Sequence, residues 1–170
     1  MVNIEILEKE GKISRIKETE IERYLQFYAS SYNDNLKHSE STSENYPRWS
    51  IISGYYAMHD ISKLAIAKIY RLKIEREVHA TTIKVLKEVI NNQETLKLIE
   101  EGYEKFKNLA DELSDAKKER FKAQYYTGSK FMKKKYKETA KEFHNDFVTP
   151  YIKKIEELIG KWLPIYLTKN

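Results

Sequence analysis

The residues best suited to chemistry are two histidines, His59 and His79. A histidine titrates near neutral pH, so either ring could remove a proton from a ribose 2′-hydroxyl group or donate a hydrogen bond to a phosphate. His79 lies near Arg76 at the start of an expected helix, where a cation and free N–H groups favour a phosphate. The alternative is structural: His59 is a partly buried or dimer-facing histidine with one hydrogen bond, and His79 packs on a loop.

A second polar group surrounds Asp60. Tyr56 lies one turn before this carboxylate and Lys63 three residues after it, so the three side chains share one face of a helix. Such a group could bind a nucleotide or orient a catalytic base. The alternative is a solvated or interhelical ion pair, which on a helix surface contributes only about 0.2–0.5 kcal/mol.

A third group combines an arginine with aromatic rings. Arg120 is followed by Gln124, Tyr125 and Tyr126, and a guanidinium beside aromatic faces can hold a phosphate while a base stacks on a ring. Alternatively, Arg120 reaches Asp60 across the bundle and the tyrosines fill the core.

Positive charge is concentrated in the second half of the chain. Residues 117–137 hold nine Lys or Arg residues against one acid, Glu119, although the net charge of the whole chain is only +5. This segment, which includes Lys133, Lys134 and Lys135, could attract phosphates. A solvated lysine face on a long helix is the alternative.

Several kinds of chemistry are disfavoured. The chain has no cysteine, which excludes disulfides, thiol catalysis and cysteine-ligated zinc. Its four histidines lack metal-ligand spacing, and it has neither a glycine-rich phosphate loop nor a nucleophile elbow. We therefore expect no metal and no cofactor.

The elements that must position these residues are helices. Glycine (5) and proline (3) are scarce among the 170 residues, and apolar residues recur at spacings of three and four. We predict an all-α, up-down bundle of four to five helices in a single domain, 1–170, with its core at about 19–162. The organising element is a helix from Pro47 to about residue 71, whose apolar face contains the small residues Gly54, Ala57 and Ala65.

The other expected helices are 3–10, about 19–36, about 78–90, one or two within 93–126, and about 130–162. Thr19-Glu20-Ile21-Glu22 predicts a capping box, and 38–45 predicts a serine-rich loop. Residues 12–18 and 73–77 are expected to be connectors, 127–129 a turn, and no strand is expected. In the last helix, Pro150 is expected to kink or end the helix at Thr149, and Pro164 to end the regular structure. Its expected buried stripe consists of Phe131, Tyr136, Ala140, Phe143, Phe147, Tyr151, Ile155, Leu158 and Ile159.

Several motifs, in order, resemble those of a known family. Tyr55-Tyr56-Ala57-Met58 resembles the Tyr-Tyr-Ala-Met-Phe-His signature of HEPN domains, the small helical bundles of prokaryotic toxin–antitoxin and defence systems. Residues 7–13 resemble the leader of small HEPN proteins, His79 stands where they often carry a histidine, and Arg120-Phe-Lys-Ala-Gln-Tyr125 resembles their Arg-x-x-Ala-Asp-Tyr segment. The resemblance covers about residues 5–160.

The chain also departs from the family pattern. His59-Asp60 stands where the family usually has Phe-His, so the histidine is displaced by one position, about 100° around the helix. Ribonuclease HEPN proteins carry a motif in which four to six residues separate an arginine from a histidine, and this chain lacks that spacing. Seven residues separate Arg71 from His79, two separate Arg76 from His79, and ten separate Arg48 from His59.

The resemblance implies a homodimeric protein that interacts with RNA or nucleotides and pairs with a small nucleotidyltransferase in a toxin–antitoxin or defence module. If it cleaves RNA, we expect metal-independent chemistry with His59 or His79 as the base and Arg120 or Arg76 stabilising the phosphorane. The alternative is a non-catalytic dimeric module for binding or scaffolding. Because the sequence has neither an apolar signal-peptide core at its N-terminus nor an apolar run of about 18 residues, we expect a cytoplasmic protein with no membrane span.

Overall fold

The computed structural model describes residues 4–90, 114–115, 117–122 and 137–166. The elements follow one another as α1 (Ile4–Lys9), β1 (Ile13–Arg15), α2 (Glu18–Thr42), α3 (Pro47–Tyr70), β2 (Leu72–Ile74), α4 (Val78–Ile90), the π-helix η1 (Phe143–Val148) and α9 (Thr149–Tyr166). Residues 114–115 and 117–122 are also helical. The predicted all-α bundle is confirmed.

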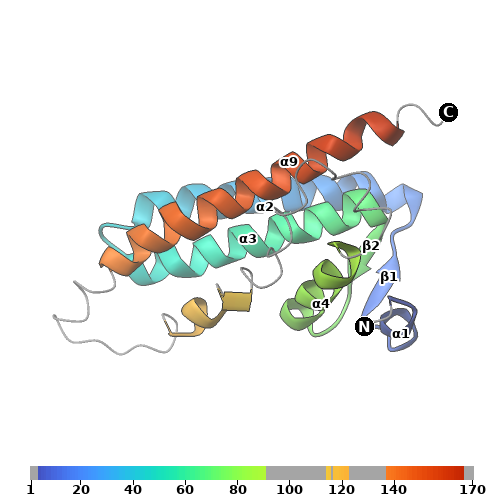
Figure 1. The fold of residues 1–170 in the computed structure, drawn as a ribbon, viewed down its shortest axis with the longest axis horizontal. Helices are drawn as coiled ribbons and strands as arrows, with labels where there is room; N and C mark the ends of the chain where they lie inside the picture. The colour runs from blue at the N-terminus through green and yellow to red at the C-terminus, as the bar shows by residue number, and fades with distance from the viewer. Residues whose placement is uncertain (1–3, 91–113, 116, 123–136, 167–170) are drawn as a thin grey trace.

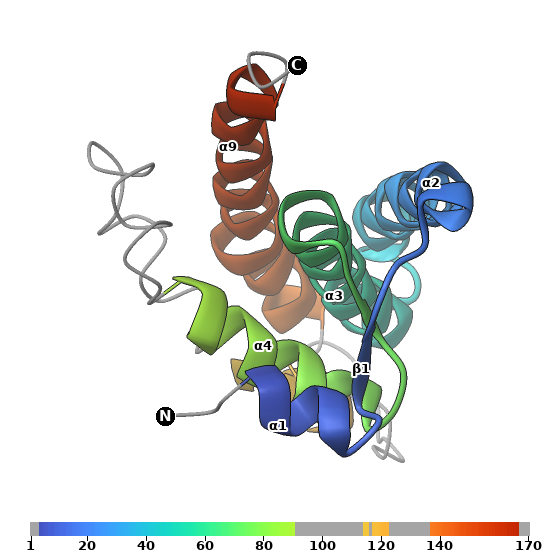
Figure 2. The same cartoon turned by 90° about the vertical axis from the view of Figure 1, so that its right-hand side faces the viewer.

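Helix α3 is the centre of the bundle. It runs antiparallel to α2 (Figure 1), and in the end-on view it lies between α2 and α9 with α4 on a third side (Figure 2). Every residue from Ala57 to Ala67 is buried, which amounts to about three full turns. The predicted range is confirmed, and Pro47 occupies the first turn as expected. A helix buried all round must bury its polar side chains as well.

Helix α2 is longer than the sequence pattern predicted. It continues to Thr42, so the expected loop at 38–45 is wrong for its first half. Serine and threonine suit this turn because their hydroxyl groups can bond to the preceding turn: Thr42 Oγ1 donates to the carbonyl oxygen of His38 at 2.6 Å. Ser39 is fully buried against α3. The predicted capping box is also wrong, because the helix starts at Glu18 and its N-cap residue, Lys17, makes no side-chain cap bond.

Two short strands replace the connectors expected at 12–18 and 73–77. β1 and β2 pair antiparallel, with Ile13 opposite Ile74 and Arg15 opposite Leu72. Each strand has only three residues, too few for the alternation of apolar and polar residues to stand out in the sequence. The pair becomes possible because Arg71 adopts a left-handed conformation (φ 56°) at the end of α3 and turns the chain back.

The last helix passes through Pro150 rather than ending there. Just before it, η1 widens the helix, and the N–H of Thr149 bonds to the carbonyl oxygen of His144, five residues back. Pro150 therefore lies inside a continuous helix, directly after this wider turn. The expectation that Pro164 ends the regular structure is likewise wrong, because α9 extends to Tyr166.

The π-helix also changes which side chains are buried. Phe147 is 48% exposed, contrary to the prediction, whereas Val148 is fully buried. In a π-helix the residue five positions on, and not four, lies on the same face, so Val148 rather than Phe147 shares the buried face of Phe143. The other described members of the predicted stripe, Ala140, Phe143, Tyr151, Ile155, Leu158 and Ile159, are buried as expected.

Other predictions fall outside the described residues: most of the 93–126 helical region, the turn at 127–129, and Phe131 and Tyr136 of the stripe. Within the described part of the chain, none of the helices combines the length and the apolar character needed to traverse a lipid bilayer.

Gly54 marks the closest approach of other elements to α3. A Cβ atom at this position would lie 2.8 Å from Val148 Cγ2 and 2.9 Å from Ser39 Oγ, so both α2 and η1 would have to move. We expect Gly54→Ala to lower the free energy of unfolding by about 1–3 kcal/mol, measured by urea denaturation.

Gly160→Ala is the matched control. This glycine is exposed within α9, and its added Cβ would meet no atom within 4 Å, so we expect a gain of about 0.5–1 kcal/mol from helix propensity. If both alanine variants were as stable as the wild type, the packing described here would be wrong.

Candidate functional site

Residues from three parts of the chain meet on one side of α3. Tyr55 and His59 lie one turn apart on α3, His79 lies in the first turn of α4, and Arg120 belongs to the helical segment 117–122. We call these four residues the histidine cluster. His59, His79 and Arg120 were each candidates from the sequence, and the structure brings them together.

Tyr55 and His79 form the shortest polar contact of the cluster. Tyr55 Oη lies 2.6 Å from His79 Nδ1. Tyr55 is fully buried, and burial raises the pKa of its phenol, so the hydroxyl group stays protonated. Because His79 Nδ1 is the acceptor found for this buried hydroxyl among the described residues, we infer that Tyr55 donates to Nδ1. The proton of the neutral His79 ring must then be on Nε2, which becomes a hydrogen-bond donor.

His59 packs against this pair. Its ring centroid lies 4.6 Å from that of His79 and 5.9 Å from that of Tyr55. The side chain is only 2% exposed. Its Nε2 atom has no hydrogen-bond partner among the described residues, although buried polar atoms nearly always have one. His59 thus has unused hydrogen-bonding capacity at Nε2.

Arg120 covers the aromatic side of the cluster. Its guanidinium carbon lies 5.3 Å from the ring centroid of Tyr55 and 4.4 Å from that of Phe121, distances typical of cation–π contacts. Its Nη1 donates to Tyr56 Oη at 3.4 Å. Arg120 is buried, whereas Tyr56 is half-buried. A permanently charged guanidinium is therefore held beside two neutral histidines.

The electrostatics of the cluster favour an anion. Burial, assisted by the charges of His59 and Arg120, lowers the pKa of His79 from 6.5 to about 4. Burial likewise lowers the pKa of His59, although Asp60 opposes the shift. Both rings are neutral at pH 7, and an added negative group would meet a guanidinium and the Nε2–H of His79.

One carboxylate oxygen of Asp60 faces α2, and the other lies between Lys63 and the cluster, 3.6 Å from Nδ1 of His59. Its Oδ2 accepts hydrogen bonds from Ser31 Oγ at 2.6 Å and Asn35 Nδ2 at 3.3 Å, and its Oδ1 lies 3.6 Å from Lys63 Nζ. Burial alone would raise the pKa of Asp60, but contacts with His59 and Ser31 and the charge of Lys63 lower it below its ordinary value. The cation beside Asp60 is Lys63, three residues on in the same helix, so this ion pair is buried within α3 and is neither solvated nor interhelical.

The remaining sequence candidates are placed as follows. Arg76 is exposed, outside the contacts that define the cluster. Tyr125, Lys133, Lys134 and Lys135 lie outside the described residues. Tyr56 borders the cluster through Arg120. Within the described ranges, no three His, Asp or Glu side chains lie close enough to hold a metal ion.

Sequence reasoning missed two sets of polar residues. Tyr55 is not among the residues predicted for the site, although its position one turn before His59 could have signalled a shared site. The other set surrounds His144, whose Nδ1 lies 3.0 Å from Ser39 Oγ and whose Nε2 lies 3.5 Å from Thr149 Oγ1. Both nitrogens of that histidine have partners, so it serves packing. Its partner Ser39 lies 105 residues away in sequence, which no local pattern could reveal.

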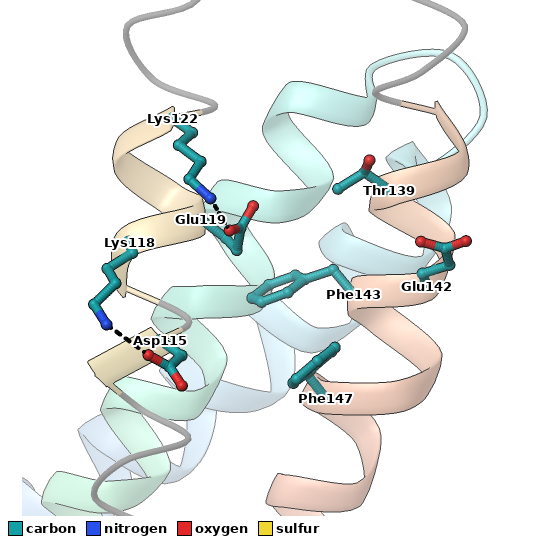
Figure 3. Close-up of a pocket in the computed structure, with 8 residues that line it drawn as sticks. All are labelled: Asp115, Lys118, Glu119, Lys122, Thr139, Glu142, Phe143 and Phe147. Carbon is teal, nitrogen blue, oxygen red and sulfur yellow. Dashed lines mark hydrogen bonds and ion pairs between the residues drawn. The ribbon is translucent and has the colours of Figure 1, made fainter.

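The other face of the 117–122 segment borders a groove of about 480 Å³ (Figure 3). Phe143 and Phe147 project into it from the last helix, and their rings stack at 6.0 Å. On the opposite wall, Lys118 pairs with Asp115 at 2.8 Å and Lys122 pairs with Glu119 at 2.5 Å. Because both lysines are neutralised by acids of their own segment, this groove suits a phosphate less well than the histidine cluster does.

No protein-family model matches this chain, and neither a curated protein nor a solved structure matches it.

The lowered pKa of His79 has a consequence for stability. Between pH 6.5 and about 4 the unfolded chain binds a proton at this histidine and the folded chain does not, so the free energy of unfolding falls as the pH is lowered through this range. Above pH 6.5 His79 contributes no pH dependence. We expect urea denaturation at a series of pH values to give a shallower loss of stability for His79→Gln than for the wild type. Identical slopes would mean that His79 titrates normally in the folded protein.

Proposed function

We propose that this chain is a HEPN-like protein that binds RNA or a nucleotide, with a phosphate held at the histidine cluster. The observation that carries the proposal is the convergence of Arg120 and His79, 41 positions apart in sequence, on the buried side chain of Tyr55. The order of motifs that resembles HEPN domains supports the same conclusion.

Three kinds of donor favour a phosphate here. Arg120 carries a permanent charge and a planar set of N–H groups. His79 offers Nε2–H because Tyr55 occupies its Nδ1. Helix α4 begins at Val78, so His79 lies in its first turn, where backbone N–H groups lack partners within the helix. The half-buried ring of Tyr56 adds an aromatic surface beside Arg120.

A metal-independent ribonuclease is the second candidate. It is favoured by one observation: two histidines that are neutral at pH 7 pack at 4.6 Å beside an arginine. A neutral imidazole can accept a ribose 2′-hydroxyl proton, and the guanidinium can stabilise the phosphorane, giving a 2′,3′-cyclic phosphate. The absence of the family's arginine–histidine spacing favours binding without cleavage.

The resemblance also suggests the setting. We propose a cytoplasmic homodimer that pairs with a nucleotidyltransferase-type partner in a toxin–antitoxin or defence module, or, as the alternative, a dimeric scaffold without catalysis. Large aromatic side chains at the protein surface support an interface: Phe27 is 62% exposed, Tyr46 63% and Trp49 53%.

We expect Arg120→Met to weaken the binding of a fluorescent single-stranded RNA by about 10- to 100-fold, as measured by anisotropy, because a charge-assisted contact of about 1.5–3 kcal/mol is lost. Lys122→Met is the matched control, because it removes the same charge from the same segment but at an exposed position paired with Glu119. We expect it to change binding by no more than about threefold.

An equal loss in both variants would mean that general attraction to a basic segment drives binding. No binding by the wild type would refute the proposal.

The same RNA incubated with wild-type protein and a chelator tests the ribonuclease candidate: a cyclic-phosphate product that disappears in His79→Gln supports it, and intact RNA refutes it.

A further inference from the structure

A chain of buried polar contacts leads from α2 through α3 to the histidine cluster. Ser31 and Asn35 both donate to Oδ2 of Asp60, while Oδ1 of the same carboxylate lies 3.6 Å from Lys63 Nζ and 3.6 Å from His59 Nδ1. Asp60, Lys63 and His59 are all buried. Lys63 Nζ also lies 4.1 Å from the ring centroid of Tyr28 on α2. The carboxylate is thus fixed from several directions.

The Asp60 carboxylate favours one tautomer of His59, because its Oδ1 lies 3.6 Å from Nδ1, slightly beyond hydrogen-bond distance. An ionised carboxylate only accepts hydrogen bonds, so it stabilises a proton on the nearer nitrogen, Nδ1. The Nε2 atom then carries a lone pair. Nε2 is a buried atom without a hydrogen-bond partner among the described residues, and its ring packs against His79.

We propose that Asp60 is a positioning residue that holds His59 in the Nδ1-protonated tautomer, so that Nε2 is the hydrogen-bond acceptor of the histidine cluster for a hydroxyl group of the bound ligand. The part that concerns the ligand rests on the proposed function. The cluster then offers donors from Arg120 and His79 and one acceptor from His59. This set of groups fits a ligand that presents a hydroxyl group beside a phosphate, as a ribonucleotide does.

The contacts of Asp60 predict what its amide would do. In Asp60→Asn, we expect the side-chain oxygen to take the position of Oδ2, because Ser31 and Asn35 both donate there. The NH₂ group must then face His59 Nδ1 and donate to it, which drives the histidine proton to Nε2. In Ser31→Ala the carboxylate remains, so the tautomer should not change.

The test is a long-range ¹H–¹⁵N spectrum of protein with ¹⁵N-labelled histidine, in which His59 is assigned by its absence in His59→Gln. We expect the wild type and Ser31→Ala to carry the proton on Nδ1 and Asp60→Asn to carry it on Nε2. A wild-type proton on Nε2 overturns the proposal, and so does a folded Asp60→Asn with an unchanged tautomer. If Asp60→Asn does not fold, the wild-type spectrum still decides.

The ligand is tested with uridine 3′-monophosphate and its 2′-deoxy form, which differ only in one hydroxyl group. By calorimetry we expect the wild type to bind the ribose form about tenfold more tightly, which corresponds to one hydrogen bond. Equal affinities overturn the role of Nε2 as the acceptor for the ligand. If neither nucleotide binds, the proposed function fails, while the spectrum still decides the role of Asp60.

Discussion

The burial of α3 on every side is the constraint on which the rest of the structure depends. Polar side chains on this helix cannot reach water, so each must find a partner in a neighbouring element. Ser62 pairs with Tyr151 of α9 at 2.6 Å, Asp60 with Ser31 of α2, and Tyr55 with His79 of α4. These directional contacts fix the three surrounding helices relative to α3, which apolar packing alone specifies less sharply.

The same constraint separates a structural histidine from candidate functional ones. His144 has a hydroxyl partner at each nitrogen, so its hydrogen-bonding capacity is used within the fold. His59 has no partner at Nε2 among the described residues, and His79 is only half-buried beside a charged arginine. The hydrogen-bonding capacity that the fold does not use therefore lies where α3, α4 and the 117–122 segment meet.

The sequence predicted elements with strong periodicity and missed those that depend on tertiary contacts. Residues from Pro47 to Tyr70 and from Val78 to Ile90 could be assigned because apolar spacing and end signals agree. The β1–β2 pair and the last turns of α2 could not, because three-residue strands and a buried serine have no distinct local pattern. At the site, residue type identified His59, His79 and Arg120 individually. Their meeting, and the turn of Asp60 toward α2, depend on how the helices cross.

The central claim is that the histidine cluster, and not the pair of Ser39 and His144, is where this protein binds its ligand. An NMR titration of the histidine ring resonances with a short single-stranded RNA tests it most directly. We expect saturable shifts for His59 and His79 while His144 stays unchanged. Binding that leaves His59 and His79 unshifted, or that shifts His144 equally, would contradict it.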